Sequence, residues 1–297
     1  MTRRPALHVS STLPSGRMSR AETRLMSRLE RIAPALGLAL LLTASLAART
    51  QHPEPQARLC RAFSCTEAGI VRGRLDRKQM ALIFTGGDFA DGGLHIRRVL
   101  KEHRVKASFF FTGDFYRSPE KKDLIRGLKA DGHYLGPHSD KHLLYCDWDD
   151  RSKTLVTREE FRNDILANYR VMQDHGIALQ EARFFIPPYE WYNRDIARWA
   201  EELGLVLFNF TPGTTSNADY TTPSMPEYRG SETIYNSIIS HERSDPHGFN
   251  GFILLIHIGT APERMDKLYT RLDDLLDYLA ARGYSLVRVD ELLDPSR

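Results

Sequence analysis

Short strand-like runs alternate with helical patterns through most of this 297-residue chain, and this alternation limits the possible folds more than any other feature. The runs are rich in β-branched and aromatic residues, which favour strands. They lie at residues 80–84, 107–111, 133–136, 183–186, 206–210, 252–257 and 285–288. The repeat predicts an α/β fold with a parallel sheet and crossover helices, either closed as a barrel or doubly wound.

The helical segments between these runs carry recognisable end signals. Thr157 with Glu160 forms a capping-box pattern, and glycines follow several of the helical segments. The expected helices run from Pro119 to Gly132, Thr157 to Gly176, Asn193 to Gly204 and Pro262 to Arg282.

The first 47 residues look like a secretory signal peptide rather than part of the fold. Arginines precede an apolar run, 32–48, and Ser45 and Ala47 are the small residues that a signal peptidase requires. We expect cleavage after Ala47 and a secreted or periplasmic protein with no stable membrane anchor, an uncleaved leader being the alternative. Residues 48–79 are polar and predict a linker, and residues 80–297 predict the folded domain.

Charge and cysteine content exclude some classes of protein. The leader holds seven of the 41 basic residues and two of the 38 acidic ones, which leaves 34 basic against 36 acidic residues. No nucleic-acid-binding face is indicated. An exported protein can join Cys60 to Cys65 and leave Cys146 free, but three cysteines exclude a disulfide scaffold.

Polar residues follow several predicted strands, at the edge where a parallel sheet or barrel carries its active site. Asp88 and Asp91 follow the first run, His138 and His142 follow the third, and His257 ends the sixth. Two histidines four residues apart can hold one divalent metal ion, and Asp88 would complete a set of three ligands. The alternatives are structural. His138 and His142 could instead lie at the surface or cap a helix, and His257 could be a core residue.

These motifs resemble the polysaccharide deacetylases of carbohydrate esterase family 4 over about residues 80–293. The segments GHYLGPHSDKH, KASFFFTG and ILLIHIG are the closest matches. The resemblance implies a distorted (β/α)7 barrel with parallel strands. It implies metal binding by Asp88, His138 and His142, with His257 as general acid.

The fourth-run motif, PPYEWYN, implies the substrate-binding residues. By resemblance, the ring and backbone N–H of Tyr189 border the substrate and oxyanion site. Pro188, Trp191 and Asn209 are further candidates for substrate contact. Nearby aromatic side chains at Tyr145, Trp148 and Tyr192 are able to stack on sugar rings, although loop aromatics more often serve packing.

The chain departs from the family pattern at the catalytic base. Gly87 stands where the family has the base, and Ile186 stands where it has the arginine that pairs with that base. Asp91 is the first candidate for a replacement base, with a turn-stabilising role as its alternative. Asp140 and Glu190 are weaker candidates.

The expected function is metal-dependent removal of N- or O-linked acetyl groups from a carbohydrate or polysaccharide. The ion expected from these ligands is Zn²⁺, which lowers the pKa of a bound water to about 7. A non-catalytic, metal-containing carbohydrate-binding protein of the same fold is the alternative. A metal-dependent amidase acting on a non-sugar substrate would use the same residues.

Overall fold

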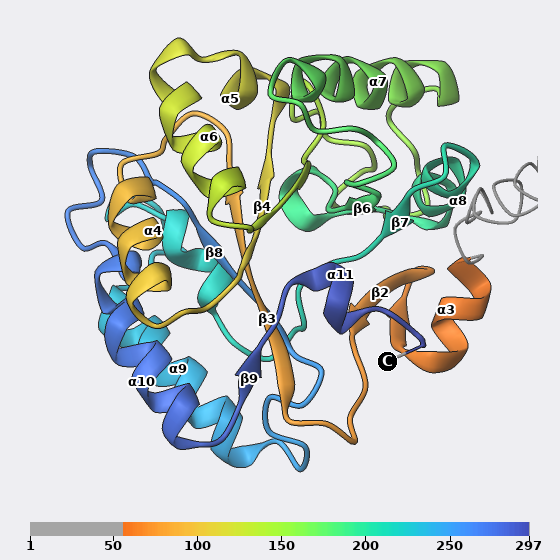
Figure 1. The fold of residues 1–297 in the computed structure, drawn as a ribbon. Coiled ribbons are helices and arrows are strands. Elements are labelled where there is room, and N and C mark those ends of the chain that lie inside the picture. Colours follow the sequence, from red (N-terminus) through yellow and green to blue (C-terminus); the bar gives the residue numbers. More distant parts are fainter. Residues whose placement is uncertain (1–55, 297) are drawn as a thin grey trace, which may run out of the picture. The chain divides into compact units, whose positions relative to one another are not determined.

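The computed structural model describes residues 56–296, and their seven parallel strands coincide with the seven predicted runs (Figure 1). Five strands form one sheet in the order β5-β4-β3-β8, with β9 pairing with the beginning of β3. The remaining two, β6 and β7, pair with each other. The strands are β3 (Gln79–Gly86), β4 (Ser108–Phe111), β5 (Tyr134–Pro137), β6 (Phe184–Phe185), β7 (Val206–Leu207), β8 (Ile253–His257) and β9 (Ser285–Leu286). The α/β fold with parallel strands is confirmed.

Strand register brings the chemistry-bearing loops to one edge. Thr85, near the end of β3, lies opposite Phe110 of β4 and His257 of β8. All three strands run in the same direction, so the loops after them leave the sheet together.

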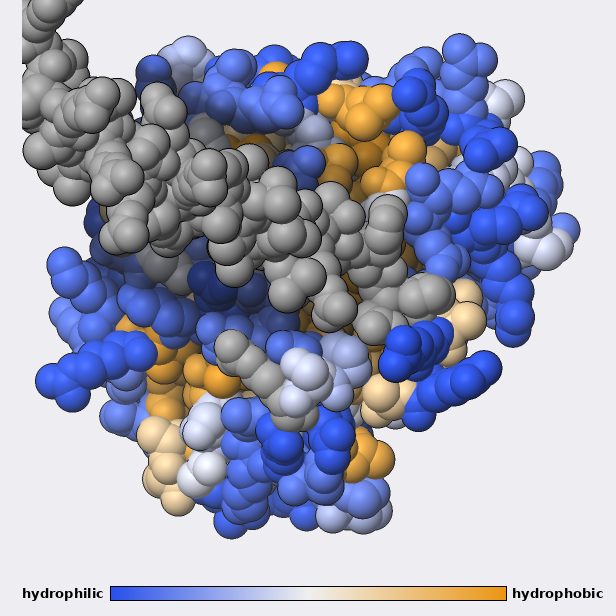
Figure 2. Space-filling model, turned by 45° about the vertical axis from the view of Figure 1, so that its right-hand side comes forward, coloured by the Kyte–Doolittle hydropathy of each residue, from blue (hydrophilic) through white to orange (hydrophobic). Residues whose placement is uncertain are grey.

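Helices surround the strands, as Figure 1 shows. The α-helices that follow strands are α4 (Gly93–Glu102), α5 (Gly113–Arg117), α6 (Lys122–Ala130), α7 (Arg158–Asp174), α8 (Arg194–Glu202), α9 (Ser231–Ser244), α10 (Leu272–Ala281) and α11 (Val289–Leu292). The short 3-10 turns are η1 (Pro119–Lys121), η2 (Pro188–Glu190), η3 (Ser216–Tyr220) and η4 (Leu268–Arg271). Polar outer faces account for the largely hydrophilic surface in Figure 2. No helix within residues 56–296 is long and apolar enough to cross a membrane.

Most helix ends follow the sequence signals. Both hydrogen bonds of the predicted capping box at Thr157 are present, and Asn193 caps α8 by accepting from the backbone N–H of Ile196 at 3.1 Å. The expected start at Pro262 is wrong, because the helical turns begin only at Leu268. Residues 262–267 instead form a loop around the fully buried Arg264, which donates hydrogen bonds to the carbonyls of Thr221 and Arg229.

The predicted linker needs correction over residues 56–79, which are folded rather than extended. They contain α3 (Gln56–Ala62) and an antiparallel pair, β1 (Ser64–Thr66) and β2 (Gly69–Arg72), and a disulfide joins Cys60 to Cys65. The Gln56 side-chain amide donates to the carbonyl of Leu207 at 2.8 Å, so this segment packs on the domain. Cys146 is free and buried. The predicted signal peptide lies outside the described residues.

Candidate active site

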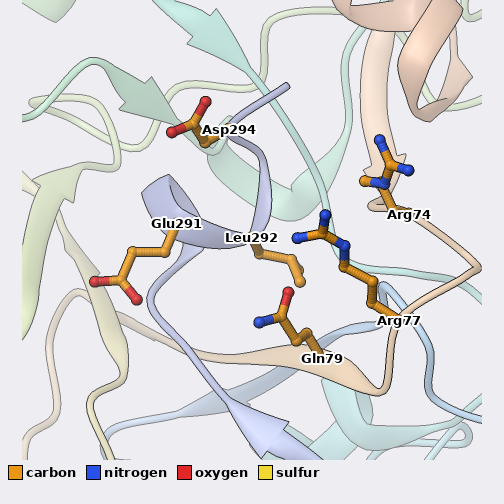
Figure 3. A pocket seen from close by; sticks show the side chains of 6 residues that line it. All are labelled: Arg74, Arg77, Gln79, Glu291, Leu292 and Asp294. Atoms are coloured by element: carbon orange, nitrogen blue, oxygen red, sulfur yellow. The ribbon is translucent and has the colours of Figure 1, made fainter. Parts of the chain in front are cut away.

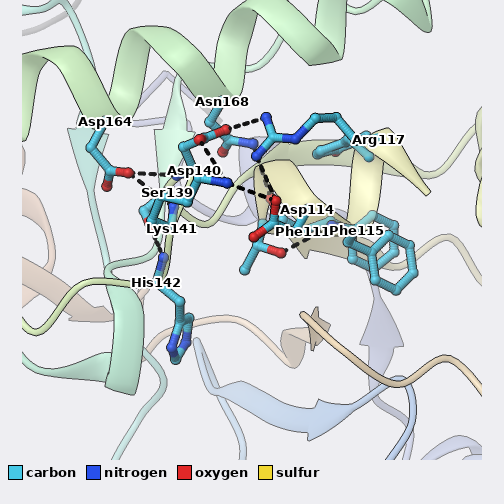
Figure 4. Close-up of polar contacts among 12 residues, drawn as sticks. Phe111, Asp114, Phe115, Arg117, Ser139, Asp140, Lys141, His142, Asp164 and Asn168 are labelled. Carbon is cyan, nitrogen blue, oxygen red and sulfur yellow. Dashed lines mark hydrogen bonds and ion pairs between the residues drawn. The ribbon is translucent and has the colours of Figure 1, made fainter.

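The histidine-bearing loop after β5 has an unusual backbone that a buried carboxylate holds in place (Figure 4). Ser139 and His142 adopt positive φ angles of 68° and 53°, a region that non-glycine residues occupy at a cost. The Asp164 carboxylate, from α7, accepts hydrogen bonds from the backbone N–H groups of Asp140 (3.2 Å) and Lys141 (2.9 Å). The Ser139 hydroxyl accepts from the backbone N–H of His142 at 2.9 Å. The loop is therefore fixed from both the helix and its own side chains.

This loop brings His138 and His142 together. Their Nε2 atoms lie 3.2 Å apart. The Nδ1 atom of His138 faces the carbonyl oxygen of Ile186 at 2.9 Å, which assigns the proton to Nδ1 and leaves a lone pair on Nε2. Burial holds the pKa of His138 well below its usual value, and burial together with the charge of His257 lowers the pKa of His142 to about 4. Both rings are neutral near pH 7, the state in which imidazole binds a metal.

Asp88 does not join this pair. Asp88 is exposed to solvent. Lys121 Nζ donates to the backbone carbonyls of Gly87 (2.8 Å) and Asp88 (2.9 Å). Within residues 56–296 no three His, Cys, Asp or Glu side chains are grouped so that they could hold a metal. The two histidines have the donor chemistry for a divalent ion, whereas the predicted set of three is not assembled.

Two of the three candidate bases serve structural purposes here. Asp91 accepts hydrogen bonds from the Thr260 N–H (2.8 Å) and the Tyr269 hydroxyl (2.8 Å), and its Oδ2 lies 3.1 Å from Lys267 Nζ. Burial raises the pKa of Asp91, but these donors outweigh burial and lower the pKa overall. A carboxylate that three donors hold in its ionised form is a poor base.

Asp140 is engaged in the same way, because its Oδ1 lies 2.6 Å from a guanidinium nitrogen of Arg117 (Figure 4). The geometry therefore does not support the predictions that Asp91 or Asp140 takes the place of the missing base.

Glu190, the third candidate, lies within the site. Its Oε1 is 3.9 Å from Nε2 of His138, and its side chain is 12% exposed. Burial raises the pKa of Glu190 to about 7, and the positive charge of His257 opposes that shift. Tyr189 and Glu190 both have positive φ angles, 59° and 54°. Asn209 donates its side-chain amide to the carbonyl of Glu190 at 2.7 Å, which holds this turn in place.

His257 forms a pair with Asp219, a residue to which the sequence analysis gave no role. His257 Nδ1 lies 2.6 Å from Asp219 Oδ1, and the His257 backbone N–H donates to Oδ2 at 2.9 Å. Burial lowers the pKa of His257, but the buried Asp219 carboxylate outweighs it and the net shift is upward. The imidazole is thus oriented by Asp219 and retains its proton to higher pH. The sequence gives little indication that Asp219 pairs with His257, because the two residues are 38 positions apart and Asp219 does not directly follow a strand.

The remaining predicted contact residues differ in exposure. Tyr189 is exposed, and its ring centroid lies 4.4 Å from that of His142. Pro188 is buried beneath the turn, while Trp191 is half-buried and donates its indole N–H to the carbonyl of Asp147 at 3.0 Å. Tyr145 and Tyr192 are fully buried, so they pack in the interior and present no face to a sugar.

The two family positions that have changed also differ in their surroundings. A Cβ atom added at Gly87 would meet only Thr112, at 3.7 Å, which is ordinary van der Waals contact. Ile186 is fully buried. A carboxylate side chain thus has room to start at position 87, whereas position 186 lies in an apolar interior.

A separate pocket lies at the opposite end of β3 (Figure 3). It is lined by Arg74, Arg77, Gln79, Glu291, Leu292 and Asp294. Arg74 is paired with Asp76 at 2.7 Å, and the lining combines charges of both signs. We assign no ligand to it.

Comparison with known proteins gives a consistent family. A polysaccharide deacetylase model matches residues 72–208. The chain is 22% identical over 239 residues to a peptidoglycan-N-acetylglucosamine deacetylase of Bacillus cereus, covering 79% of this chain and 76% of that protein. It is 26% identical over 216 residues to the corresponding enzyme of Listeria monocytogenes, covering 72% of this chain but only 39% of the relative.

Solved structures show the same fold. A pseudoenzyme of the CE4 family from Bacillus anthracis superposes with a TM-score of 0.60 at 20% identity, covering 78% of this chain and 70% of that one. A mutant of that pseudoenzyme with restored enzymatic activity matches with the same TM-score and identity, covering 78% of this chain and 73% of that one. The family model, the relatives and the fold agree on a polysaccharide deacetylase domain, which the family model matches over residues 72–208.

Proposed function

We propose that this protein is a metal-dependent deacetylase that hydrolyses N- or O-linked acetyl groups on a carbohydrate. The proposal depends on two groups that can transfer protons. His257, held by Asp219, can act as a general acid. The carboxylate of Glu190 lies beside the two neutral histidines and can act as a base. The charges of His257 and Glu190 shift each other's pKa, which supports their closeness in one site. A relative that deacetylates peptidoglycan N-acetylglucosamine supports the substrate class.

Glu190 and His257 divide the proton transfers in this proposal. Glu190, with a pKa near 7, accepts a proton from the attacking water as the nucleophile adds to the acyl carbon. His257 then donates the proton on Nε2 to the departing amine or alkoxide, while Asp219 holds Nδ1. The backbone N–H of Tyr189 would stabilise the oxyanion, as the family resemblance implies.

His138 and His142 would hold the divalent ion, Zn²⁺ being the expected one, with Asp88 as the carboxylate whose charge already acts on the pKa of His142. When bound, such an ion supplies a positive charge that polarises the acyl carbonyl.

A second function, binding a carbohydrate without turnover, is favoured by Gly87 and Ile186 and by the resemblance to a CE4 pseudoenzyme. Acetate release from a panel of acetylated glycans, with and without chelator, separates the two. The deacetylase is supported if the protein releases acetate, if a chelator abolishes that release and if Glu190→Gln lowers it. Absence of turnover in the unaltered protein, followed by its appearance in Gly87→Asp, supports the binding protein.

Export is a further part of the proposal. The disulfide between Cys60 and Cys65 is typical of a protein that matures in an oxidising compartment. N-terminal sequencing of secreted or periplasmic material should begin shortly after Ala47. A protein recovered only from the cytoplasm with Met1 intact would contradict export.

A further inference from the structure

A cavity of about 220 Å³ lies at the amino end of β5. Its lining comes from the last turn of α6, the start of β5, the segment between α7 and β6, and the segment after β9. His133, which lines the cavity, precedes β5, whereas His138 of the candidate active site follows that strand. The cavity is therefore separate from the place where acetyl groups would react.

His133 presents a hydrogen-bond donor to this cavity. The residue is 6% exposed, and its Nδ1 atom accepts from the backbone N–H of Ala107 at 3.1 Å. Burial, and then the charge of Lys106, lower the pKa of His133 to about 4, so the ring is neutral near pH 7. A neutral imidazole that accepts at Nδ1 carries its proton on Nε2. Within residues 56–296 no acceptor is paired with that Nε2–H.

Tyr134 supplies a second donor beside an apolar wall. It is 4% exposed, and its hydroxyl oxygen accepts from the backbone N–H of Phe184 at 2.8 Å. The hydroxyl proton is left to donate, and no acceptor for it is found in the described part of the chain. Leu135 and Ile177, both buried, belong to the same lining. The inner part of the cavity thus combines hydrogen-bond donors with apolar side chains.

The rim of the cavity adds positive charge. Lys129 Nζ donates to two backbone carbonyls, at 3.1 and 2.5 Å, which leaves one N–H of the ammonium group. No carboxylate among residues 56–296 lies within ion-pair distance of Lys129. Arg288 also lines the cavity and is paired with Asp290 at 2.6 Å. Glu181 is the acidic residue of the lining, and it is exposed to water, which screens its charge.

We propose that this cavity binds a small organic oxyanion, a carboxylate or phosphate group joined to a short apolar body. The oxyanion accepts hydrogen bonds from His133 and Tyr134 and lies near the Lys129 ammonium group, while the apolar body contacts Leu135 and Ile177. A cation does not suit the cavity, because both inner polar groups are donors and Lys129 is positive. The site does not depend on the deacetylase proposal.

An NMR titration of the full-length protein tests this site. Labelling histidine with ¹⁵N makes the Nε2–H signal of His133 observable, and His133→Asn identifies that signal, because the asparagine oxygen can still accept from Ala107. Acetate, butyrate, inorganic phosphate and butyl phosphate are added at constant ionic strength set with chloride. A saturable shift of the His133 signal is expected, and the head group that gives it distinguishes a carboxylate from a phosphate. The butyl form should bind about fourfold more tightly or better, the effect of one buried CH₂ group.

Charge variants at the rim should act with opposite signs. Lys129→Gln should weaken binding about threefold and Glu181→Gln should strengthen it about threefold, because each changes one charge near the oxyanion. Both side chains are exposed, so these variants test the site even if His133→Asn fails to fold. Lys122→Gln is the matched control, since Lys122 is exposed at the other end of α6, and it should leave binding unchanged.

Three results would overturn the site. They are the absence of a saturable shift with all four anions, equal affinity of the Lys129→Gln protein and its parent, and equal affinity for anions with and without the butyl group. Acetate release is not measured in this experiment, so failure of the deacetylase proposal would leave its result standing.

Discussion

Glu190 combines two features that each cost free energy, a left-handed backbone and a buried carboxyl group. Glycine adopts the left-handed region without this cost. A residue that is unfavourable for stability at its position, and that faces His138, is a strong candidate for a functional role.

Replacing Glu190 should therefore separate stability from activity. Glu190→Gly should raise the free energy of unfolding by about 1 kcal/mol, because relief of the left-handed backbone exceeds the added freedom of the unfolded chain. Turnover should fall by about 10²- to 10⁴-fold. Glu190→Gln keeps the backbone cost, so it should lose activity without that gain. Urea unfolding and acetate release measure the two effects, and full activity in both variants would exclude Glu190 as the base.

The pair of His257 and Asp219 predicts a specific pH dependence. The acid is the protonated imidazole, and the net upward shift of the His257 pKa keeps it protonated above its usual value of about 6.5. Activity should therefore fall as pH rises through the raised pKa. Asp219→Asn removes the carboxylate that raises the pKa, so the alkaline limb of kcat/KM should move to lower pH. If Asp219 were only structural, activity would fall equally at every pH.

At the scale of elements, α7 positions the histidine-bearing loop through two side chains, Asp164 and Asn168, the second of which accepts from the backbone N–H of His138 at 3.1 Å. Asp164 accepts two backbone N–H groups from the loop and the Tyr145 hydroxyl.

Asp164→Ala should lower the free energy of unfolding by about 2 to 4 kcal/mol, because two backbone N–H groups lose their acceptor, that of Asp140 in a buried place and that of Lys141 in a partly buried one. Asp174→Ala, an exposed carboxylate at the other end of α7, should change it by less than about 0.5 kcal/mol. Denaturant unfolding of the two variants checks this.

Helix ends were predicted correctly where residues close in sequence determine them. The Thr157 capping box and the Asn193 cap depend on residues three apart, and both form as predicted. The failed helix start at Pro262 depends instead on Arg264, whose partners Thr221 and Arg229 lie 43 and 35 residues away. No local pattern shows such a contact.

At the scale of the whole molecule, the positions of the seven strands along the chain were predictable because strand-like runs alternate with helical segments. The roles of the individual residues in the candidate active site were harder to predict. Asp91 is a plausible base in its own loop, but Lys267 and Tyr269, which neutralise and bind it, come from another part of the chain. Burial of Glu190 likewise results from packing of distant segments, so the sequence alone did not rank it first.

Metal content depends on the assembled molecule and tests the ligands together. Full-length protein prepared with Zn²⁺ should contain about one ion, and the double variant His138→Ala, His142→Ala should lose both the ion and acetate release. His103→Ala serves as control, since His103 pairs with Asp273 at 2.7 Å on another part of the surface. Metal analysis of the purified proteins decides this, and undiminished metal in the double variant would contradict the assignment.

The space left at Gly87 and the burial of Ile186 also limit which substitutions this site accepts. A carboxylate at position 87 would begin in a half-buried place with room for it, whereas an arginine at position 186 would introduce a charge into an apolar interior. An unpaired buried charge costs about 3 to 5 kcal/mol. The fold therefore accepts an aspartate at position 87 far more readily than an arginine at position 186, and an arginine there needs that aspartate as its partner.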